Sequence, residues 1–195
     1  MNRYIDVTPS KCIGCRTCEI ACVLAHANDI QGVSAGAPIS ANEQNEVLAY
    51  LGFMPRLSVI KSENVCMPVT CHHCDDAPCA AVCPNGAISH VQNTVQVDHN
   101  RCIGCKSCML ACPYGMMEVV TVPMSRPFGG ARLATGVKAQ AHKCDLCLDR
   151  AKGPACVSAC PTQALAVFDP KGTRDTMAGR RLQAAQQATA GEARP

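Results

Sequence analysis

The sequence predicts an α+β fold made of two similar halves, in which short strands and short helices alternate around cysteine-rich loops. Two kinds of cysteine motif each occur twice along the 195 residues, and they alternate in order. Short runs of alternating apolar and polar residues separate the motifs and are typical of strands. Aromatic residues make up only 3% of the chain and tryptophan is absent, so large side chains cannot fill a core. Bound metal groups stabilise small domains of this composition.

The first kind of motif spaces four cysteines as C-x-x-C-x-x-C-x-x-x-C. It occupies residues 12–22 and is nearly repeated at residues 102–112. The second kind begins with C-x-x-C and ends in C-x-x-x-C-Pro, at residues 71–83 and 144–160. Because the two kinds alternate, we expect one structural unit that is built twice.

The runs between the motifs place the secondary structure. Strands are predicted at residues 56–61, 87–91, 94–98, 117–122 and 164–168, and short helices at 19–26 and around 109–111. Residues 1–170 are expected to form one domain with insertions at 28–55 and 123–141. The second insertion reads as a loop because it is rich in proline and glycine. Residues 171–195 are expected to form a polar C-terminal tail whose middle is compatible with a helix.

The cysteine spacing indicates iron–sulfur chemistry. The run C-x-x-C-x-x-C-x-x-x-C-Pro is that of bacterial ferredoxins, in which the fourth cysteine ligates the other cluster of a pair. The motif at 102–112 matches it fully, and the motif at 12–22 has Val23 in place of the proline. We therefore predict two ferredoxin-like halves, related by pseudo-two-fold symmetry, around four [4Fe–4S] clusters. The predicted ligands are Cys12, Cys15, Cys18, Cys22, Cys71, Cys74, Cys79, Cys83, Cys102, Cys105, Cys108, Cys112, Cys144, Cys147, Cys156 and Cys160.

Glycine and proline positions fit this interpretation. Gly14 and Gly104 stand where the backbone must turn sharply and approach a cluster. A proline follows the last cysteine of three motifs, at Pro84, Pro113 and Pro161, and turns the chain out of its helix. We expect the loop amides to point at the sulfur atoms.

Zinc and disulfides are the two alternatives to clusters. Zinc sites usually combine two pairs of cysteines and have no use for the third cysteine of C-x-x-C-x-x-C. A disulfide scaffold requires export to an oxidising compartment, and the N-terminal residues show no apolar export signal. A reducing cytoplasm is therefore the expected location.

The remaining chemistry-bearing residues have simpler interpretations. Cys66, the seventeenth cysteine, belongs to no complete spacing and is expected to be a packed or spare thiol. His72 and His73 lie inside a cysteine loop but are not needed as ligands, since every set of four cysteines is complete. The basic residues beside the motifs are expected to be solvated, with compensation of cluster charge as the alternative; they are Lys11, Arg16, Arg101, Lys106, Lys143, Arg150 and Lys152.

Charge and motif content exclude several classes of function. The formal net charge is +3, but loading with four clusters brings it to about −5, which argues against nucleic-acid binding. No run of about 18 apolar residues is present, so we expect no membrane span. Phosphate-binding loops, dinucleotide fingerprints and catalytic triads are also absent from the sequence. We therefore expect an electron-transfer protein without its own substrate site, and not an enzyme.

Residues 3 to about 170 resemble the four-cluster iron–sulfur subunits of molybdenum oxidoreductases such as dimethyl sulfoxide reductase and formate dehydrogenase. The segments that carry the resemblance include residues 11–18, 83–88, 112–120 and 143–147. They look most like electron-transport proteins of the formate dehydrogenase H and formate hydrogenlyase system. The resemblance implies electron transfer as a subunit or carrier for a molybdenum oxidoreductase, a hydrogenase or both. An accessory or maturation factor for such an enzyme is the alternative.

The resemblance also implies which cysteines share a cluster, because in this family the first and last motifs form one pair and the middle two form the other. Cluster one takes Cys12, Cys15, Cys18 and Cys160. Cluster two takes Cys22, Cys144, Cys147 and Cys156. Cluster three takes Cys71, Cys74, Cys79 and Cys112, and cluster four takes Cys83, Cys102, Cys105 and Cys108.

Overall fold

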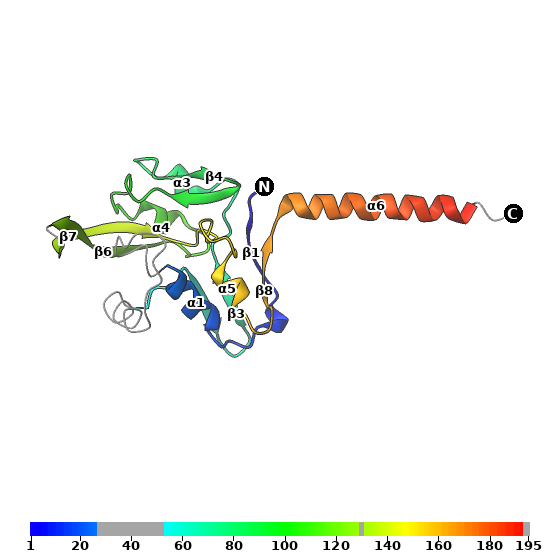
Figure 1. Ribbon diagram of the computed structural model, residues 1–195, viewed down its shortest axis with the longest axis horizontal. Helices are drawn as coiled ribbons and strands as arrows, with labels where there is room; N and C mark the ends of the chain where they lie inside the picture. The colour runs from blue at the N-terminus through cyan, green and yellow to red at the C-terminus, as the bar shows by residue number, and fades with distance from the viewer. Residues whose placement is uncertain (27–52, 129–130, 193–195) are drawn as a thin grey trace.

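The computed structural model describes residues 1–26, 53–128 and 131–192 (Figure 1). It has the expected mixture of short helices and antiparallel strands. The strands are β1 (Tyr4–Val7), β2 (Leu57–Lys61), β3 (Cys66–Thr70), β4 (Ile88–Val91), β5 (Thr94–Val97), β6 (Glu118–Phe128), β7 (Ala131–His142) and β8 (Leu165–Phe168). The helices are η1 (Pro9–Lys11), α1 (Thr17–Ala25), α3 (Pro78–Ala81), α4 (Ser107–Ala111), α5 (Ala155–Ser158) and α6 (Pro170–Glu192).

The two ends of the cysteine-rich region pair with each other. β1 and β8 form an antiparallel sheet in which Tyr4 lies opposite Phe168 and Val7 opposite Leu165. Ile5 and Leu165 are buried in one apolar cluster with side chains of the first and fourth motifs. Glu19 of α1 is also buried, and its Oε1 accepts a hydrogen bond of 2.6 Å from the backbone amide of Val59 in β2. The first and fourth motifs therefore share one half of the molecule, with α1 beside α5 (Figure 1).

The second and third motifs share the other half. The β4–β5 hairpin connects them, and α3 packs against α4. Their apolar cluster contains Ala77, Ile88, Val95, Met117 and Ala141, all buried. In Figure 1 this half lies above α1 and α5.

The prediction that residues 123–141 form a loop is wrong. β6 and β7 pair from Glu118↔His142 to Phe128↔Ala131, so the segment is a long hairpin. The prolines are tolerated because each strand of a two-stranded sheet has an open edge, where a missing amide hydrogen costs nothing. The register shifts between Met124 and Ser125, and Gly136 beside it has φ +132°. These are the features of a β-bulge, which strengthens the local twist.

The C-terminal tail is a helix over most of its length. α6 starts at Pro170 and projects away from the rest of the chain (Figure 1). All of residues 171–187 are exposed. No helix among the described residues has the length and apolarity to cross a membrane. Most of the predicted insertion at 28–55 lies outside the described residues.

The other predicted elements agree with the structure to within about two residues, except that β6 continues beyond the strand predicted at 117–122. The strands predicted at 56–61, 87–91, 94–98 and 164–168 are β2, β4, β5 and β8, and 117–122 is the first half of β6. β1 and β3 were not predicted.

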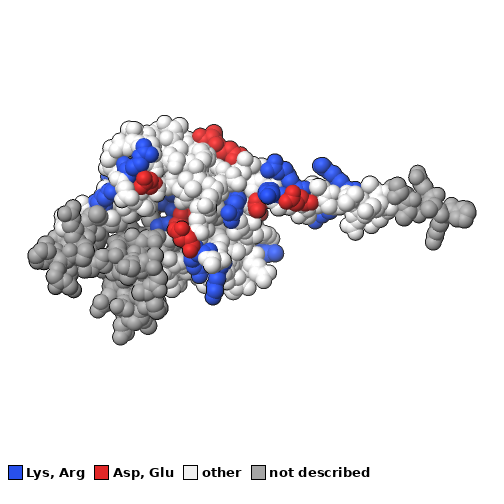
Figure 2. Space-filling model, turned by 45° about the horizontal axis from the view of Figure 1, so that its top comes forward, with Lys and Arg blue, Asp and Glu red and all other residues white. Residues whose placement is uncertain are grey.

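On the face shown in Figure 2, acidic and basic side chains are interspersed, with both signs at the base of α6.

Candidate metal centres

The two copies of the first motif share one backbone conformation. Gly14 and Gly104 have φ +68° and +69°, and Arg16 and Lys106 have φ +60° and +67°. Each left-handed basic residue lies at the N-terminus of the helix that carries the next cysteine, α1 or α4. This loop geometry leaves the third cysteine of each run, Cys18 and Cys108, buried, while Cys15 and Cys105 are exposed.

The second kind of motif also repeats its geometry. Each cysteine that opens the loop accepts a backbone hydrogen bond from the residue two positions later, at 3.4 Å for both His73 to Cys71 and Leu146 to Cys144. The donating residues both have positive φ, +46° at His73 and +59° at Leu146. The local chain direction is therefore set by the same turn in both copies.

Backbone amides point at the sulfur of the last cysteine in three motifs. The residue four positions later donates in each case: Ala87 to Cys83 at 3.2 Å, Met116 to Cys112 at 3.4 Å and Ala164 to Cys160 at 3.3 Å. Amides from other segments donate to Cys22 and Cys102. Donors of this kind stabilise thiolates and tune the potential of iron–sulfur groups, as the sequence predicts.

The thiols gather in four groups of four. Cys12, Cys18 and Cys160 lie close enough to Cys15 for the thiolate charges to act on each other, and Cys22, Cys144 and Cys147 act in the same way on Cys156. One cavity is lined by Cys71, Cys74, Cys79 and Cys112, and another by Cys83, Cys102, Cys105 and Cys108. Each group contains the same four cysteines as one of the ligand sets that the resemblance implies.

Burial disfavours the charged thiolate form of several cysteines. It is the main reason that the pKa of Cys144 is raised to about 12 and that of Cys79 to about 11. Neighbouring thiolates raise the pKa of Cys79 further. A cysteine that ligates a metal is deprotonated, so metal binding at these thiols would release protons.

A buried histidine supports the presence of a bound acceptor. His73 is 1% exposed and lines the cavity of Cys71, Cys74, Cys79 and Cys112. Its Nδ1 accepts the amide hydrogen of Val95 at 3.0 Å, so Nε2 carries the ring proton. That Nε2 has no hydrogen-bond partner in the described part of the chain. A sulfur atom of a cluster would satisfy the buried donor, so the residues present fit such a group.

The other predicted residues have clear positions. The His72 ring stacks on Tyr114, with ring centroids 4.0 Å apart. The Cys66 sulfur is 2.8 Å from the position of a Cβ atom on Gly14, and its thiol also interacts with that of Cys12. Of the seven basic residues beside the motifs, six are exposed at the surface, while Lys143 is only 4% exposed.

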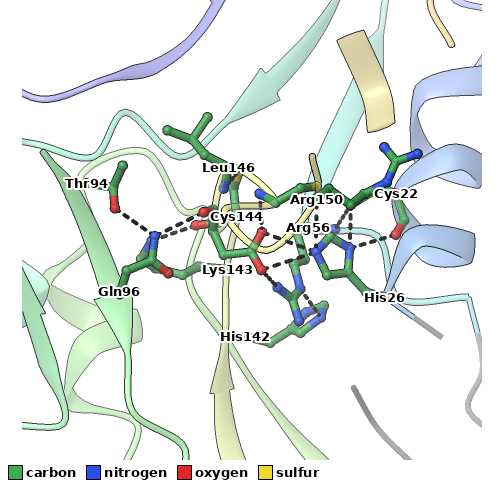
Figure 3. A network of polar contacts seen from close by, with 12 residues as sticks. Cys22, His26, Arg56, Thr94, Gln96, His142, Lys143, Cys144, Leu146 and Arg150 are labelled. Atoms are coloured by element: carbon green, nitrogen blue, oxygen red, sulfur yellow. Dashed lines mark hydrogen bonds and ion pairs between the residues drawn. The ribbon is translucent and has the colours of Figure 1, made fainter. Parts of the chain in front are cut away.

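A buried polar network beside Cys22 and Cys147 was missed by sequence reasoning. His26 Nε2 lies 3.1 and 3.2 Å from the two carboxylate oxygens of Asp145, which also pairs with Arg56. Arg56 Nε donates to His142 Nε2 at 3.3 Å. Figure 3 shows His26, Arg56 and His142 turned toward one another. The spacing offered a signal, since His26 lies four residues after Cys22 and Asp145 lies inside a cysteine loop.

The comparisons with known proteins agree with this geometry. A family model for a 4Fe–4S dicluster domain matches residues 63–169, and one for a 4Fe–4S binding domain matches residues 9–22. The chain is 46% identical over 185 residues to the electron transport protein HydN of Escherichia coli (strain K12). The aligned region covers 95% of this chain and 98% of HydN. It is 38% identical to formate hydrogenlyase subunit 2 of the same organism, over 87% of this chain and 83% of that protein.

A longer relative contains a similar segment. The chain is 46% identical to the putative oxidoreductase AegA of Escherichia coli (strain K12) over 96% of its own length, but it spans only a quarter (25%) of AegA. The resemblance to electron-transfer iron–sulfur proteins is thus confirmed.

Proposed function

The chain belongs to the 4Fe–4S dicluster family of electron-transport proteins, and from this premise we propose that it transfers electrons through four [4Fe–4S] clusters. The observation that carries the proposal is the gathering of sixteen thiols into four groups of four. The bound clusters supply one-electron redox chemistry. The chain supplies the thiolates, the amide donors to sulfur and the burial, and we propose that it has no substrate site of its own.

We assign the sixteen ligands to the four sets named above. We also assign residues 1–170 to a single domain and residues 171–195 to a tail. Cysteines 22 and 160 then cross between the first two clusters, and Cys83 and Cys112 cross between the last two. The repeated φ angles of the motifs support a pseudo-two-fold relation between the halves. We also propose a reducing cytoplasmic setting, in which cysteines are more often metal ligands than disulfides.

The clusters form a linear relay in this proposal. The crossing cysteines link cluster one to two and cluster three to four. The two pairs approach each other at Cys71 and Cys144: burial is the main cause of the raised pKa of Cys144, and the nearby Cys71 thiolate raises it further. Cys15 of cluster one and Cys105 of cluster four are the exposed cysteines at the two ends. Electrons enter at one of these ends and leave at the other.

We propose that the partner is a catalytic oxidoreductase. It is a molybdenum enzyme such as a formate dehydrogenase, or a hydrogenase, or the chain serves both. The name of formate hydrogenlyase subunit 2 supports this choice. AegA, named a putative oxidoreductase, contains a segment like this chain within a longer protein. Such an arrangement is expected where a cluster-binding unit serves a redox enzyme.

Metal and sulfide analysis tests the proposal. The chain purified without oxygen is expected to hold about sixteen iron and about sixteen sulfide per molecule. Zinc without sulfide would overturn it.

Replacing Cys160 with serine tests the ligand sets: the cluster held by Cys12, Cys15 and Cys18 should be damaged, and the one held by Cys102, Cys105 and Cys108 should keep its electron paramagnetic resonance signal.

The alternative function is an accessory or maturation factor for such an enzyme. Affinity capture from cells that make the cognate enzyme separates the two. A stable stoichiometric complex with the mature catalytic subunit is expected for a subunit. Transient binding to the immature partner alone would favour the accessory function.

A further inference from the structure

Residues 2–4, which we call the strap, run from β1 to the half of the molecule that holds the second and third motifs. The backbone amide of Arg3 donates a hydrogen bond of 2.7 Å to the carbonyl oxygen of Asn93, in the turn between β4 and β5. The backbone amide of Asn2 donates to Oδ1 of Asp75, also at 2.7 Å. In Figure 1 the start of the chain lies beside β4, whereas β1 pairs with β8 of the other half. The strap therefore contacts both halves.

The side chain of Asn2 contacts the loop that carries Cys71 and Cys74. Its Nδ2 lies 2.7 Å from the carbonyl oxygen of His73 and 3.2 Å from that of Cys74. An amide NH₂ group has two hydrogens, so it donates to both oxygens at once. His90 Nδ1 lies 3.2 Å from the same nitrogen as a third neighbour. Asn2 therefore fixes the backbone of this loop through two of its carbonyl groups.

A row of stacked rings runs along the same contact. The ring of Tyr4 lies between that of Phe168 in β8, with centroids 5.0 Å apart, and that of His72 in the loop, at 5.8 Å. His72 stacks in turn on Tyr114, which follows the third motif. The chain has three Tyr and three Phe residues, and half of these rings stand in this row. Aromatic rings at such separations attract each other, so the row also joins the two halves.

The loop held by the strap is the place where the two proposed cluster pairs approach each other. Cys71 lies near Cys144 of the fourth motif, and Lys143 lines the same cavity as Cys71. Gln96 of β5 makes a second link between the halves, since its Nε2 donates to the carbonyl oxygen of Asp145 at 3.0 Å (Figure 3). A displacement of the loop would therefore change the separation of clusters two and three. The rate of electron transfer between two centres falls steeply as their separation grows.

We propose that the strap is a positioning element of the relay: Asn2 holds the loop of Cys71 and Cys74 against the other half, and so sets the separation of clusters two and three. This inference rests on the proposed ligand sets. Asn2 acts through backbone carbonyl groups and is a positioning residue, not a ligand. Release of the strap is expected to widen the gap between the pairs while each cluster keeps its four cysteines.

Electron paramagnetic resonance of the fully reduced, loaded chain tests the inference, because two reduced clusters that lie close together split each other's signals. Cys156→Ser removes cluster two and Cys79→Ser removes cluster three. The component of the splitting that is lost in both variants belongs to this pair of clusters.

Asn2→Asp keeps the size of the side chain, but an ionised carboxylate only accepts hydrogen bonds and faces two carbonyl oxygens. We expect this variant to lose that component while it keeps about sixteen iron and sixteen sulfide. Hydrogen exchange at the amide of Arg3 should become about tenfold faster, the effect of two lost hydrogen bonds. Asn100→Asp adds the same charge at an exposed position and is the matched control, which should change neither measurement.

The outcomes separate the inference from the proposed function. Low iron and sulfide in the native chain would count against the clusters themselves. Unchanged exchange in Asn2→Asp, or faster exchange with the component intact, would overturn the role of the strap alone. Should Asn2→Asp lose cluster three, Asn2→Ala, without the added charge, takes its place in the same measurements. Loss of cluster three in both variants would also overturn the inference, because Asn2 would then support the cluster and not the separation.

Discussion

Gly104 is a residue at which one added methyl group meets a neighbouring strand. A Cβ atom there would lie 2.5 Å from the Cβ of Ala139 and 2.9 Å from its carbonyl oxygen, and φ is +69°. Gly104→Ala is therefore expected to destabilise the protein by about 2–4 kcal/mol, from overpacking together with left-handed strain. The measurement is denaturant unfolding without oxygen, followed by the visible absorbance of the clusters.

Gly115 is the matched control for this substitution. Its φ is +64°, but nothing lies within 4 Å of its added Cβ. Gly115→Ala should cost only the left-handed strain, about 1–2 kcal/mol. Equal losses in the two variants would show that the contact with Ala139 does not matter.

Cys66 lies beside the first cysteine loop but outside the four sets. Its sulfur approaches Gly14, and its thiol interacts with that of Cys12. Because each set is complete without it, Cys66→Ala should retain about sixteen iron atoms, whereas Cys12→Ala should lose about four. Iron analysis decides the matter, and a loss of iron in the Cys66 variant would make it a ligand.

At the scale of elements, β8 and α6 follow each other but contribute differently. β8 pairs with β1 and buries Leu165, whereas residues 171–187 of α6 are all exposed. A chain that ends at Thr173 should keep its iron and lose less than about 0.5 kcal/mol of stability. A chain that ends at Gln163 loses β8 and should fail to hold clusters one and two.

Circular dichroism and iron analysis of the two truncated chains provide the measurement. In the chain that ends at Thr173, the helix signal should decrease while the visible absorbance stays native. A large loss of iron in the chain that ends at Thr173 would show that α6 supports the cluster-binding region after all.

At the scale of the whole molecule, Lys143 lies where the two halves meet. It is 4% exposed, lines the cavity of Cys71, Cys74, Cys79 and Cys112, and its Nζ donates to the carbonyl oxygen of Cys144 at 2.6 Å. Its positive charge acts on the thiolates of both Cys79 and Cys144. Lys143→Met should lower the potentials of clusters two and three together and leave clusters one and four unchanged.

Redox titration of this variant beside Lys152→Met, an exposed lysine, provides the measurement and its control. A shift confined to a single cluster would place Lys143 within one half. No shift at all would show that its charge is screened from both.

The sequence by itself determined the local chemistry of this protein. The cysteine spacing, with glycines at 14 and 104, predicted the loops and the iron–sulfur function, because the geometry within a run of eleven residues depends on the run itself. Alternating patterns likewise predicted β2, β4, β5 and β8. β1 was missed, since its four residues carry too little pattern and the strand exists through its pairing with β8.

Only the tertiary structure decided what depends on distant contacts. The long β6–β7 hairpin was mistaken for a loop, because proline and glycine are compatible with an open-edged, bulged strand once its partner is present. The network of His26 and Asp145 joins residues 119 positions apart. Local pattern carries no information on such pairs, because their energy comes from packing and hydrogen bonds that form only when the two ends of the chain meet.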